Sequence, residues 1–134
     1  NRDHELVPLG SEIRFAKTFV KLQKTRFEEG LEVHFKTGEE AETLLVAPVT
    51  LQNLIENAIK HNIIAPDSPL IIEILVEDGY LLVRNNKQKK NFVETSNKQG
   101  LANLKSLYQY LSGDPLTIID APSFFTVKIP LIVK

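Results

Sequence analysis

The chain of 134 residues contains no cysteine. Disulfide bonds and thiolate metal sites are therefore excluded, which suits the reducing environment of the cytosol. Neither a signal peptide nor an apolar run of membrane-spanning length is present. The first residue is Asn1 rather than methionine. This indicates a piece of a longer protein, and we expect any membrane anchor to lie outside these residues.

The charge is almost balanced, with 16 basic and 17 acidic residues and a net charge of -1. This composition excludes a strongly basic nucleic-acid-binding protein and a disordered chain. Basic residues are nevertheless concentrated between Arg84 and Lys98. Such a segment is usually only solvated, but it can also attract a polyphosphate.

Several common catalytic signatures are missing. The sequence has no Gly-x-Ser-x-Gly pattern, no P-loop and no dinucleotide glycine fingerprint. Its three histidines, His4, His34 and His61, lack the spacing of zinc ligands. His34 falls within a strand pattern, so we expect an exposed or hydrogen-bonded structural residue there. Repeats and linkers are absent as well, which favours a single compact domain.

Apolar periodicity predicts helices alternating with pairs of strands. Helices are expected at residues 11–29, 51–64 and 100–111, and strands at 31–36, 43–47, 70–76, 80–84, 116–119 and 124–133. Ser11 and Thr50 are expected to cap the first two helices, and the polar segment 85–99 is expected to be a long loop. This order predicts an α/β (α+β) sandwich of two layers. Its sheet should be mixed but mostly antiparallel, with the helices on one face.

The helix expected from Leu51 has an unusual polar face. Its apolar residues recur at helical spacing and should be buried: Leu51, Leu54, Ile55, Ala58, Ile59 and Ile63. The opposite face carries Asn53, Glu56, Asn57, Lys60 and His61. A solvated face with a Glu56–Lys60 pair is the commoner explanation of such a stripe. Asn57 argues against it, because asparagine in the middle of a helix competes with the backbone.

These residue types suit a metal ion and a phosphate chain. Mg²⁺ prefers oxygen ligands and keeps several waters, so the amide oxygen of Asn57 together with phosphate oxygens is a plausible shell. Lys60 and His61 can neutralise phosphate charge, and Glu56 can orient a water or hydroxyl as a base. A helix beginning at Gly100 would also offer free backbone N–H groups to phosphates.

The run Leu51-Gln-Asn-Leu-Ile-Glu-Asn-Ala-Ile-Lys-His-Asn62 resembles the asparagine box of the GHKL ATPases. It is most similar to that of sensor histidine kinases of the subclass that pairs with LytTR-type response regulators. The resemblance covers nearly the whole chain. Leu9-x-x-Glu12 through Arg26-Phe27 looks like the helix that leads into the catalytic domain. Ser96-x-x-Gln-Gly100-Leu-x-Asn103-Leu is similar to the second glycine-rich box, and 124–130 to the closing strand.

The resemblance implies a Bergerat-type sandwich that binds ATP and Mg²⁺. Residues 1–29 would be a lead-in helix from a preceding dimerisation region, and residues 30–134 the ATP-binding catalytic domain. The roles implied for single residues are Mg²⁺ ligand for Asn57, candidate base for Glu56, and nucleotide or phosphate contacts for Asn53, Lys60, His61, Asn85, Gly100 and Leu101.

The function implied is transfer of the γ-phosphoryl group of ATP to a histidine outside this fragment, so the fragment alone should not autophosphorylate. The implied partners are its own phosphoacceptor region, within a homodimer anchored in the inner membrane, and a LytTR-type response regulator. Two alternatives remain open. One is a degenerate, non-catalytic interaction module of the same fold with weak or no nucleotide binding. The other is a free-standing serine-directed kinase.

The sequence departs from the family pattern at three places. Asn85-Asn86-Lys87 stands where an Asp-x-Gly is usual, and Asn85 can accept the hydrogen bond of an adenine amino group only without the charge of a carboxylate. Lys98 replaces a glycine of the second box. Both lysines restrict the backbone and are expected to add positive charge near the phosphates. Leu107 stands where many relatives have an arginine.

Overall fold

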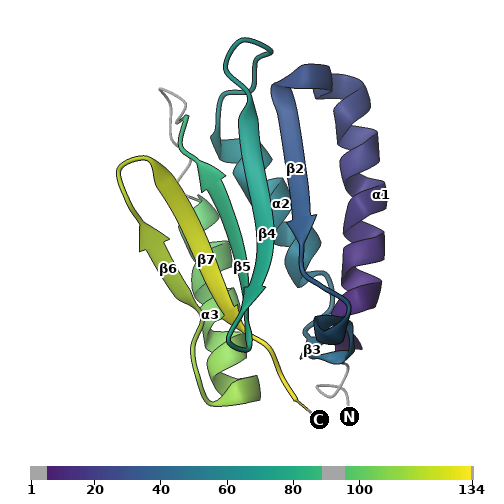
Figure 1. The fold of residues 1–134 in the computed structure, drawn as a ribbon. Coiled ribbons are helices and arrows are strands. Elements are labelled where there is room, and N and C mark those ends of the chain that lie inside the picture. The colour runs from purple at the N-terminus through teal and green to yellow at the C-terminus, as the bar shows by residue number, and fades with distance from the viewer. Residues whose placement is uncertain (1–5, 89–95, 134) are drawn as a thin grey trace.

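The computed structural model describes residues 6–88 and 96–133, with the backbone only at 96–99. Three α-helices, α1 (Leu9–Phe27), α2 (Thr50–His61) and α3 (Ser96–Ser112), accompany seven strands in the described residues (Figure 1). The strands are β1 (Val7–Pro8), β2 (Leu31–Lys36), β3 (Leu45–Val46), β4 (Leu70–Glu77), β5 (Tyr80–Asn86), β6 (Thr117–Asp120) and β7 (Phe124–Pro130). Short 3-10 turns η2 (Glu28–Gly30) and η3 (Glu40–Thr43) flank β2.

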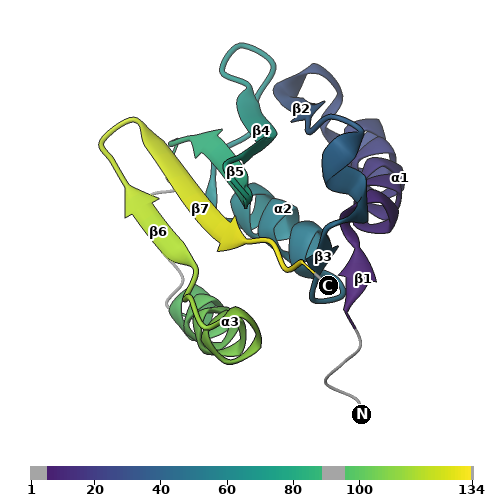
Figure 2. The same ribbon diagram turned by 60° about the horizontal axis from the view of Figure 1, so that its bottom comes forward.

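The main sheet has five strands in the order β2-β4-β5-β7-β6. Only β2 and β4 run parallel, and every other neighbouring pair is antiparallel. Figure 2 shows the three helices on the same side of this sheet. The expected two-layer arrangement with a mixed, mostly antiparallel sheet is therefore confirmed, as are the hairpins β4–β5 and β6–β7.

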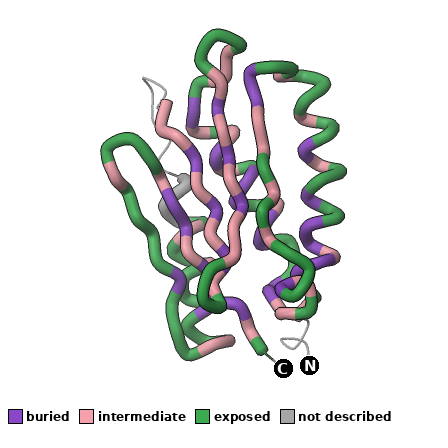
Figure 3. The backbone as a smooth tube through the Cα atoms, viewed as in Figure 1, coloured by how far each residue is buried: buried purple, intermediate pink, exposed green. Residues whose placement is uncertain are grey.

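The core lies between the sheet and the helices. Along β5, Leu81, Val83 and Asn85 are buried and alternate with partly exposed residues (Figure 3), as the two-residue period of a strand requires. Alternate residues of β4 and β7 join them from the same face. Helix α1 adds its own apolar stripe to this core: Leu9, Ile13, Ala16 and Val20.

The opposite face of the sheet is polar enough to face water. Glu73 on β4 accepts hydrogen bonds from Arg84 (2.8 Å) and Lys36 (3.2 Å). The hydrogen bond from Arg84 is the larger cause, and together with the one from Lys36 it holds the pKa of Glu73 below its usual value. The Arg84 guanidinium also lies 5.1 Å from the ring centre of Phe124. This face needs no covering element, because its charged groups are paired across neighbouring strands.

The N-terminus of α2 receives a buried carboxylate from another helix. Glu12 on α1 is 7% exposed, and its two carboxylate oxygens accept the backbone N–H groups of Val49 (2.9 Å) and Leu51 (3.1 Å). Helices leave their first N–H groups without partners inside the helix, and a negative charge at this end is stabilised by the helix dipole. Glu12 therefore joins α1 to α2 at a fixed point.

Tyr108 on α3 reaches the same place from the other side. Its hydroxyl accepts the N–H of Ala47 at 2.9 Å and lies 2.8 Å from the hydroxyl of Thr50. Thr50 donates its own proton to the carbonyl of Ala47 (2.8 Å). Tyr108 is accordingly the donor to Thr50, since each hydroxyl has one proton. All three helices thus meet at the turn that precedes α2.

Several expected boundaries are wrong. Helix α1 begins at Leu9, so Ser11 lies inside it and donates to the Pro8 carbonyl instead of capping. Thr50 likewise lies inside α2, whose preceding residue Val49 is left-handed (φ 67°). These caps could not be predicted from local sequence, because the donors of α2 are satisfied by Glu12, a residue distant in the chain.

The strand expected at 43–47 is only Leu45–Val46, and it pairs with β1 outside the main sheet. The loop expected at 85–99 is shorter at both ends, because β5 continues to Asn86 and α3 begins at Ser96. Residues 89–95 of that loop lie outside the described residues. Gly100 consequently lies within α3 and does not begin it, which corrects the expectation of a helix start there. None of the described helices has both the length and the hydropathy needed to cross a membrane.

We expect Glu12→Gln to lower the free energy of unfolding by about 1–3 kcal/mol. The side-chain NH₂ group of glutamine would face one of the two buried backbone N–H groups, which would then lose its hydrogen-bond acceptor. Urea denaturation measures this change. Glu39→Gln is the matched control, since Glu39 is exposed and an exposed substitution should change stability by less than about 0.5 kcal/mol. Equal effects of the two substitutions would contradict the capping role.

Burial raises the pKa of the Tyr108 phenol above its ordinary value of 10.0. The fold thus favours the neutral phenol, and this contribution to stability is present below that value and lost as the pH rises through the folded-state pKa. We expect the tyrosinate absorbance that disappears in Tyr108→Phe to titrate above pH 10.0. A difference titration centred at or below that pH would show that Tyr108 is not buried as described.

Candidate functional site

The polar face of α2 lines a cavity of about 610 Å³ between α2 and α3. Four of the predicted site residues come from α2: Asn53, Glu56, Asn57 and Lys60. The opposite wall comes from the first three turns of α3: Gly100, Leu101, Asn103, Leu104 and Leu107. Residues separated by 40 or more positions in the chain therefore form one concave site, as the sequence prediction required.

Helix α2 presents this face because its other side is fixed in the core. Leu51, Leu54 and Ile55 are at most 3% exposed, and Ala58 is 6% exposed. Three- and four-residue spacing places the remaining positions on the opposite side of the helix. The helix ends at His61, so Ile63 is not part of the buried stripe and is 47% exposed, contrary to expectation.

The two walls of the cavity differ in chemistry. The α2 wall offers amide, carboxylate and ammonium groups, whereas the α3 wall is formed largely by leucine side chains. Leu107, which stands where relatives have arginine, is 40% exposed and adds to the apolar wall. Ligand sites commonly combine apolar surface with a few polar groups that fix orientation. The cavity therefore suits a ligand with one apolar part and one charged part.

Two predicted site residues lie apart from the cavity lining. Asn85 is 4% exposed on the helix-facing side of β5, where its amide nitrogen donates to the carbonyl of Asn86 (2.7 Å). The side-chain oxygen is not used in that bond. His61 occupies the last position of α2 and is partly buried. The structure thus brings Asn53, Glu56, Asn57, Lys60, Gly100 and Leu101 together, and leaves Asn85 and His61 beside them.

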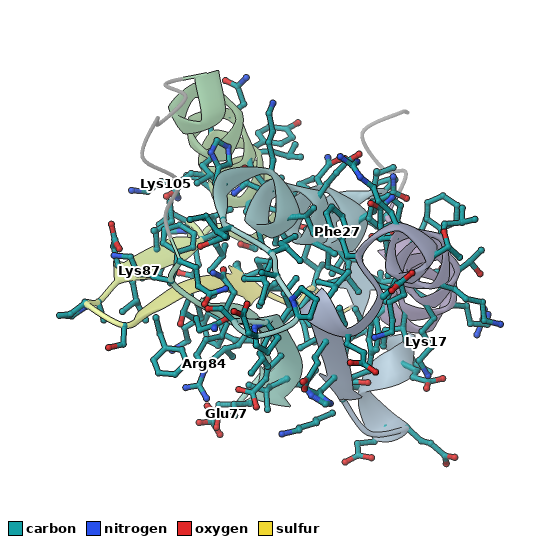
Figure 4. The ribbon with its side chains drawn as sticks, turned by 90° about the horizontal axis from the view of Figure 1, so that it is seen from above. Lys17, Phe27, Glu77, Arg84, Lys87 and Lys105 are labelled. Atoms are coloured by element: carbon teal, nitrogen blue, oxygen red, sulfur yellow. The ribbon has the colours of Figure 1, made fainter. Side chains whose placement is uncertain are left out.

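Lys87 does not add charge to the cavity, contrary to expectation. Its ammonium donates to Asp120 (2.5 Å) and to the carbonyl of Ala121 (2.9 Å), at the turn between β6 and β7. Its backbone N–H donates to the carbonyl of Ser123 in the same turn (2.9 Å). In Figure 4 Lys87 lies beside that hairpin. The side chain of Lys98 lies outside the described part of the chain.

Leu104 and Leu107 line the cavity but are not among the site residues that the sequence predicted. Helix α3 carries two apolar stripes that share Leu101 and Leu104. One packs against the core together with Tyr108 and Leu111, and the other continues to Leu107 and lines the cavity. The three-residue spacing of the second stripe was the available signal. Only the fold shows that the two stripes face different neighbours.

The side chains of the α2 wall fit a magnesium ion that is held mainly by its ligand. Among the described residues, no group of three or more His, Asp or Glu side chains could hold a metal alone. Asn57 and Glu56 nevertheless offer oxygen donors to the cavity, and Mg²⁺ is often bound through one or two protein oxygens plus substrate phosphates. The donor set therefore suits a cation that arrives with a phosphate chain.

Comparison with known sequences gives a partial match. No protein family model matches the chain. A segment of 55 residues, 41% of the chain, is 38% identical to the sensor protein kinase HptS of Staphylococcus aureus. The segment amounts to 11% of that relative's length, so the similarity covers a small part of the whole kinase.

Solved structures match over nearly the whole chain. The cytoplasmic segment of histidine kinase QseC has a TM-score of 0.66 at 14% identity, covering 96% of this chain and 78% of that one. The nucleotide-free catalytic domain of histidine kinase ThkA has a TM-score of 0.63 at 20% identity, covering 94% and 95%. The Acinetobacter baumannii histidine kinase AdeS gives 0.56 at 16% identity, covering 95% and 66%. The chain therefore has the α+β fold of histidine kinase catalytic domains, as expected.

Proposed function

We propose that this chain is the ATP-binding catalytic domain of a two-component sensor histidine kinase. The observation that carries the proposal is the cavity between α2 and α3, whose polar wall is formed by Asn53, Glu56, Asn57 and Lys60. This wall is the stretch that resembles the asparagine box, and it lies in a fold shared with histidine kinase catalytic domains. Fold alone would not justify a function, whereas a site of suitable chemistry in that fold supports one.

Several side chains in and beside the cavity have a proposed role. Asn57 would hold Mg²⁺ through its amide oxygen, and the ion would neutralise charge on the ATP phosphates. Lys60, which lines the cavity, and His61, which follows it at the end of α2, would neutralise phosphates further. Gly100 and Leu101 form the opposite wall, and leucines beside a purine would exclude water from it.

The reaction would transfer the γ-phosphoryl group to a histidine outside these residues. A bond forms between phosphorus and an imidazole nitrogen, the bond to the β–γ bridging oxygen breaks, and ADP leaves. Glu56, which lines the cavity, would orient the imidazole and accept its proton. Positioning and charge stabilisation would supply most of the catalysis, as in other phosphoryl transfers.

The wider setting is also part of this proposal. The helix α1 would connect the domain to a dimerisation and phosphoacceptor region, and the phosphoryl group would pass on to a LytTR-type response regulator. The full-length protein would be a homodimer anchored in the inner membrane, with this domain in the cytoplasm. The similarity to HptS supports a sensor kinase, and the regulator class is inferred from the asparagine-box resemblance.

Two observations favour the alternative of a non-catalytic interaction module. Asn85, the proposed adenine contact, is 4% exposed and lies outside the cavity lining, and Leu107 provides no charge where relatives have arginine. A module of this kind would keep the fold and lose the nucleotide. Measurement of ATP binding distinguishes the two functions directly.

We expect calorimetric titration with Mg²⁺–ATP to show binding, and Asn57→Ala to weaken it roughly tenfold or more, a change of about 1.4 kcal/mol. The loss follows from removal of an oxygen ligand of the ion. Gln52→Ala on the same helix is the control, because Gln52 does not line the cavity. No heat from the unchanged protein at millimolar nucleotide would refute the catalytic function, and full binding by Asn57→Ala would refute the metal assignment.

The adenine assignment predicts a change in base preference. We expect Asn85→Ala to reduce the preference for ATP over GTP several-fold, since one neutral hydrogen bond contributes about 0.5–1.5 kcal/mol. Competition between the two nucleotides, measured at equal Mg²⁺, gives the ratio. An unchanged ratio in a variant that still folds would show that another group recognises the base.

A further inference from the structure

The chain leaves β5 through three residues that each bind a different neighbour. Asn86 accepts the N–H of Ile71 (2.8 Å) and donates to the carbonyl of Pro69 (3.1 Å), which fixes the beginning of β4. Lys87 binds the turn between β6 and β7. The third residue, Gln88, turns the other way and binds the segment that follows α2.

The contacts of Gln88 form a compact set, called here the Gln88 clamp. Its backbone N–H donates to the side chain of Asn62 (2.7 Å), and its carbonyl accepts the N–H of Ile63 (2.7 Å). Its side-chain amide donates to the carbonyls of Ile63 (2.9 Å) and Ser68 (2.8 Å) and accepts the hydroxyl of Ser68 (2.5 Å). Both the backbone and the side chain of one glutamine are therefore committed to this segment.

The clamp acts on the C-terminal end of α2. Asn62 directly follows the helix, is 7% exposed, and donates through its amide to the carbonyl of Ala58 (2.9 Å). Its oxygen is the atom that receives the Gln88 N–H. The last carbonyls of a helix lack partners inside it, and such ends fray unless other groups hold them. Asn62 and Gln88 together hold the turn that carries Lys60 and His61.

We propose that Gln88 is a positioning residue for the triphosphate end of the nucleotide site. This inference rests on the proposed function and deepens it. By fixing the last turn of α2, the clamp fixes the direction in which the Lys60 ammonium enters the cavity. Gln88 itself does not line the cavity, so it acts through these neighbours.

The proposal separates the two parts of the ligand. A nucleoside has no phosphates, and the residues proposed to contact it, on the α3 wall and at Asn85, make no bond within the clamp. A triphosphate needs the ordered end of α2. Loss of the clamp should therefore weaken Mg²⁺–ATP binding while leaving adenosine binding as it is, whereas a general loss of fold would weaken both.

The test compares the affinities of Mg²⁺–ATP and adenosine in three variants of the whole chain. We expect Gln88→Ala to lower the Mg²⁺–ATP affinity about tenfold and the adenosine affinity less than twofold. Ser68→Ala, at an exposed position that loses only one contact of the clamp, should lower the ATP affinity two- to threefold. Gln109→Ala, an exposed glutamine bound to the Gly113 carbonyl at the far end of α3, should change neither.

The outcomes are distinguishable. Failure of the unchanged protein to bind Mg²⁺–ATP would refute the proposed function, and the role of Gln88 with it. If the unchanged protein binds Mg²⁺–ATP and Gln88→Ala binds it with the same affinity, the positioning role alone is refuted. Parallel loss of ATP and adenosine binding in Gln88→Ala and Ser68→Ala would show that the clamp only stabilises the fold. If Gln88→Ala does not fold, the ratio measured in Ser68→Ala decides.

Discussion

The buried carboxylate of Glu12 at the N-terminus of α2 is the contact on which the rest of the arrangement depends. It satisfies two backbone donors that the helix itself leaves open and brings a negative charge to the positive end of the helix dipole. Tyr108 holds the preceding turn from α3. Since α1, α2 and α3 meet here, the rotation of α2 about its axis is fixed relative to both other helices. That rotation decides which α2 side chains face the cavity.

The cavity forms because α2 and α3 each place some side chains against the core and others toward the opposite helix. Helix α2 buries one apolar stripe against the sheet and turns its amide, carboxylate and ammonium groups to α3. Helix α3 packs Tyr108 and Leu111 against the core, and it lines the cavity with Leu101, Leu104 and Leu107. A polar wall and an apolar wall face each other as a result. This combination suits a nucleotide, which has a flat, weakly polar base and a highly charged phosphate chain.

Much of the fold and part of the site could be predicted from sequence. The recurrence of apolar residues every three or four positions identified α2 and its polar stripe. Burial of Leu51, Leu54 and Ile55 allows only one rotation of the helix about its axis. Predictions from local residue preferences were wrong where a residue distant in the chain made the contact expected of a nearby one. Thr50 looked like a cap, but Glu12, 39 positions away from Leu51, took that role. Lys87 looked like phosphate-binding charge, yet a carboxylate from β6 holds it. Long-range contacts of this kind leave no periodic trace in the sequence.

The small pairing of β1 with β3 has a mechanical consequence. Val7 pairs with Val46, and Leu45 in turn pairs with Ile132. Strands β1 and β3 therefore lie side by side (Figure 2), and the chain near residue 132 is bonded to β3. Ala47, bound by Tyr108, follows immediately. A pull on the chain ahead of α1 would therefore load the base of α2 through a short path of hydrogen bonds in shear. The path consists of backbone contacts and ends at the helix that lines the cavity.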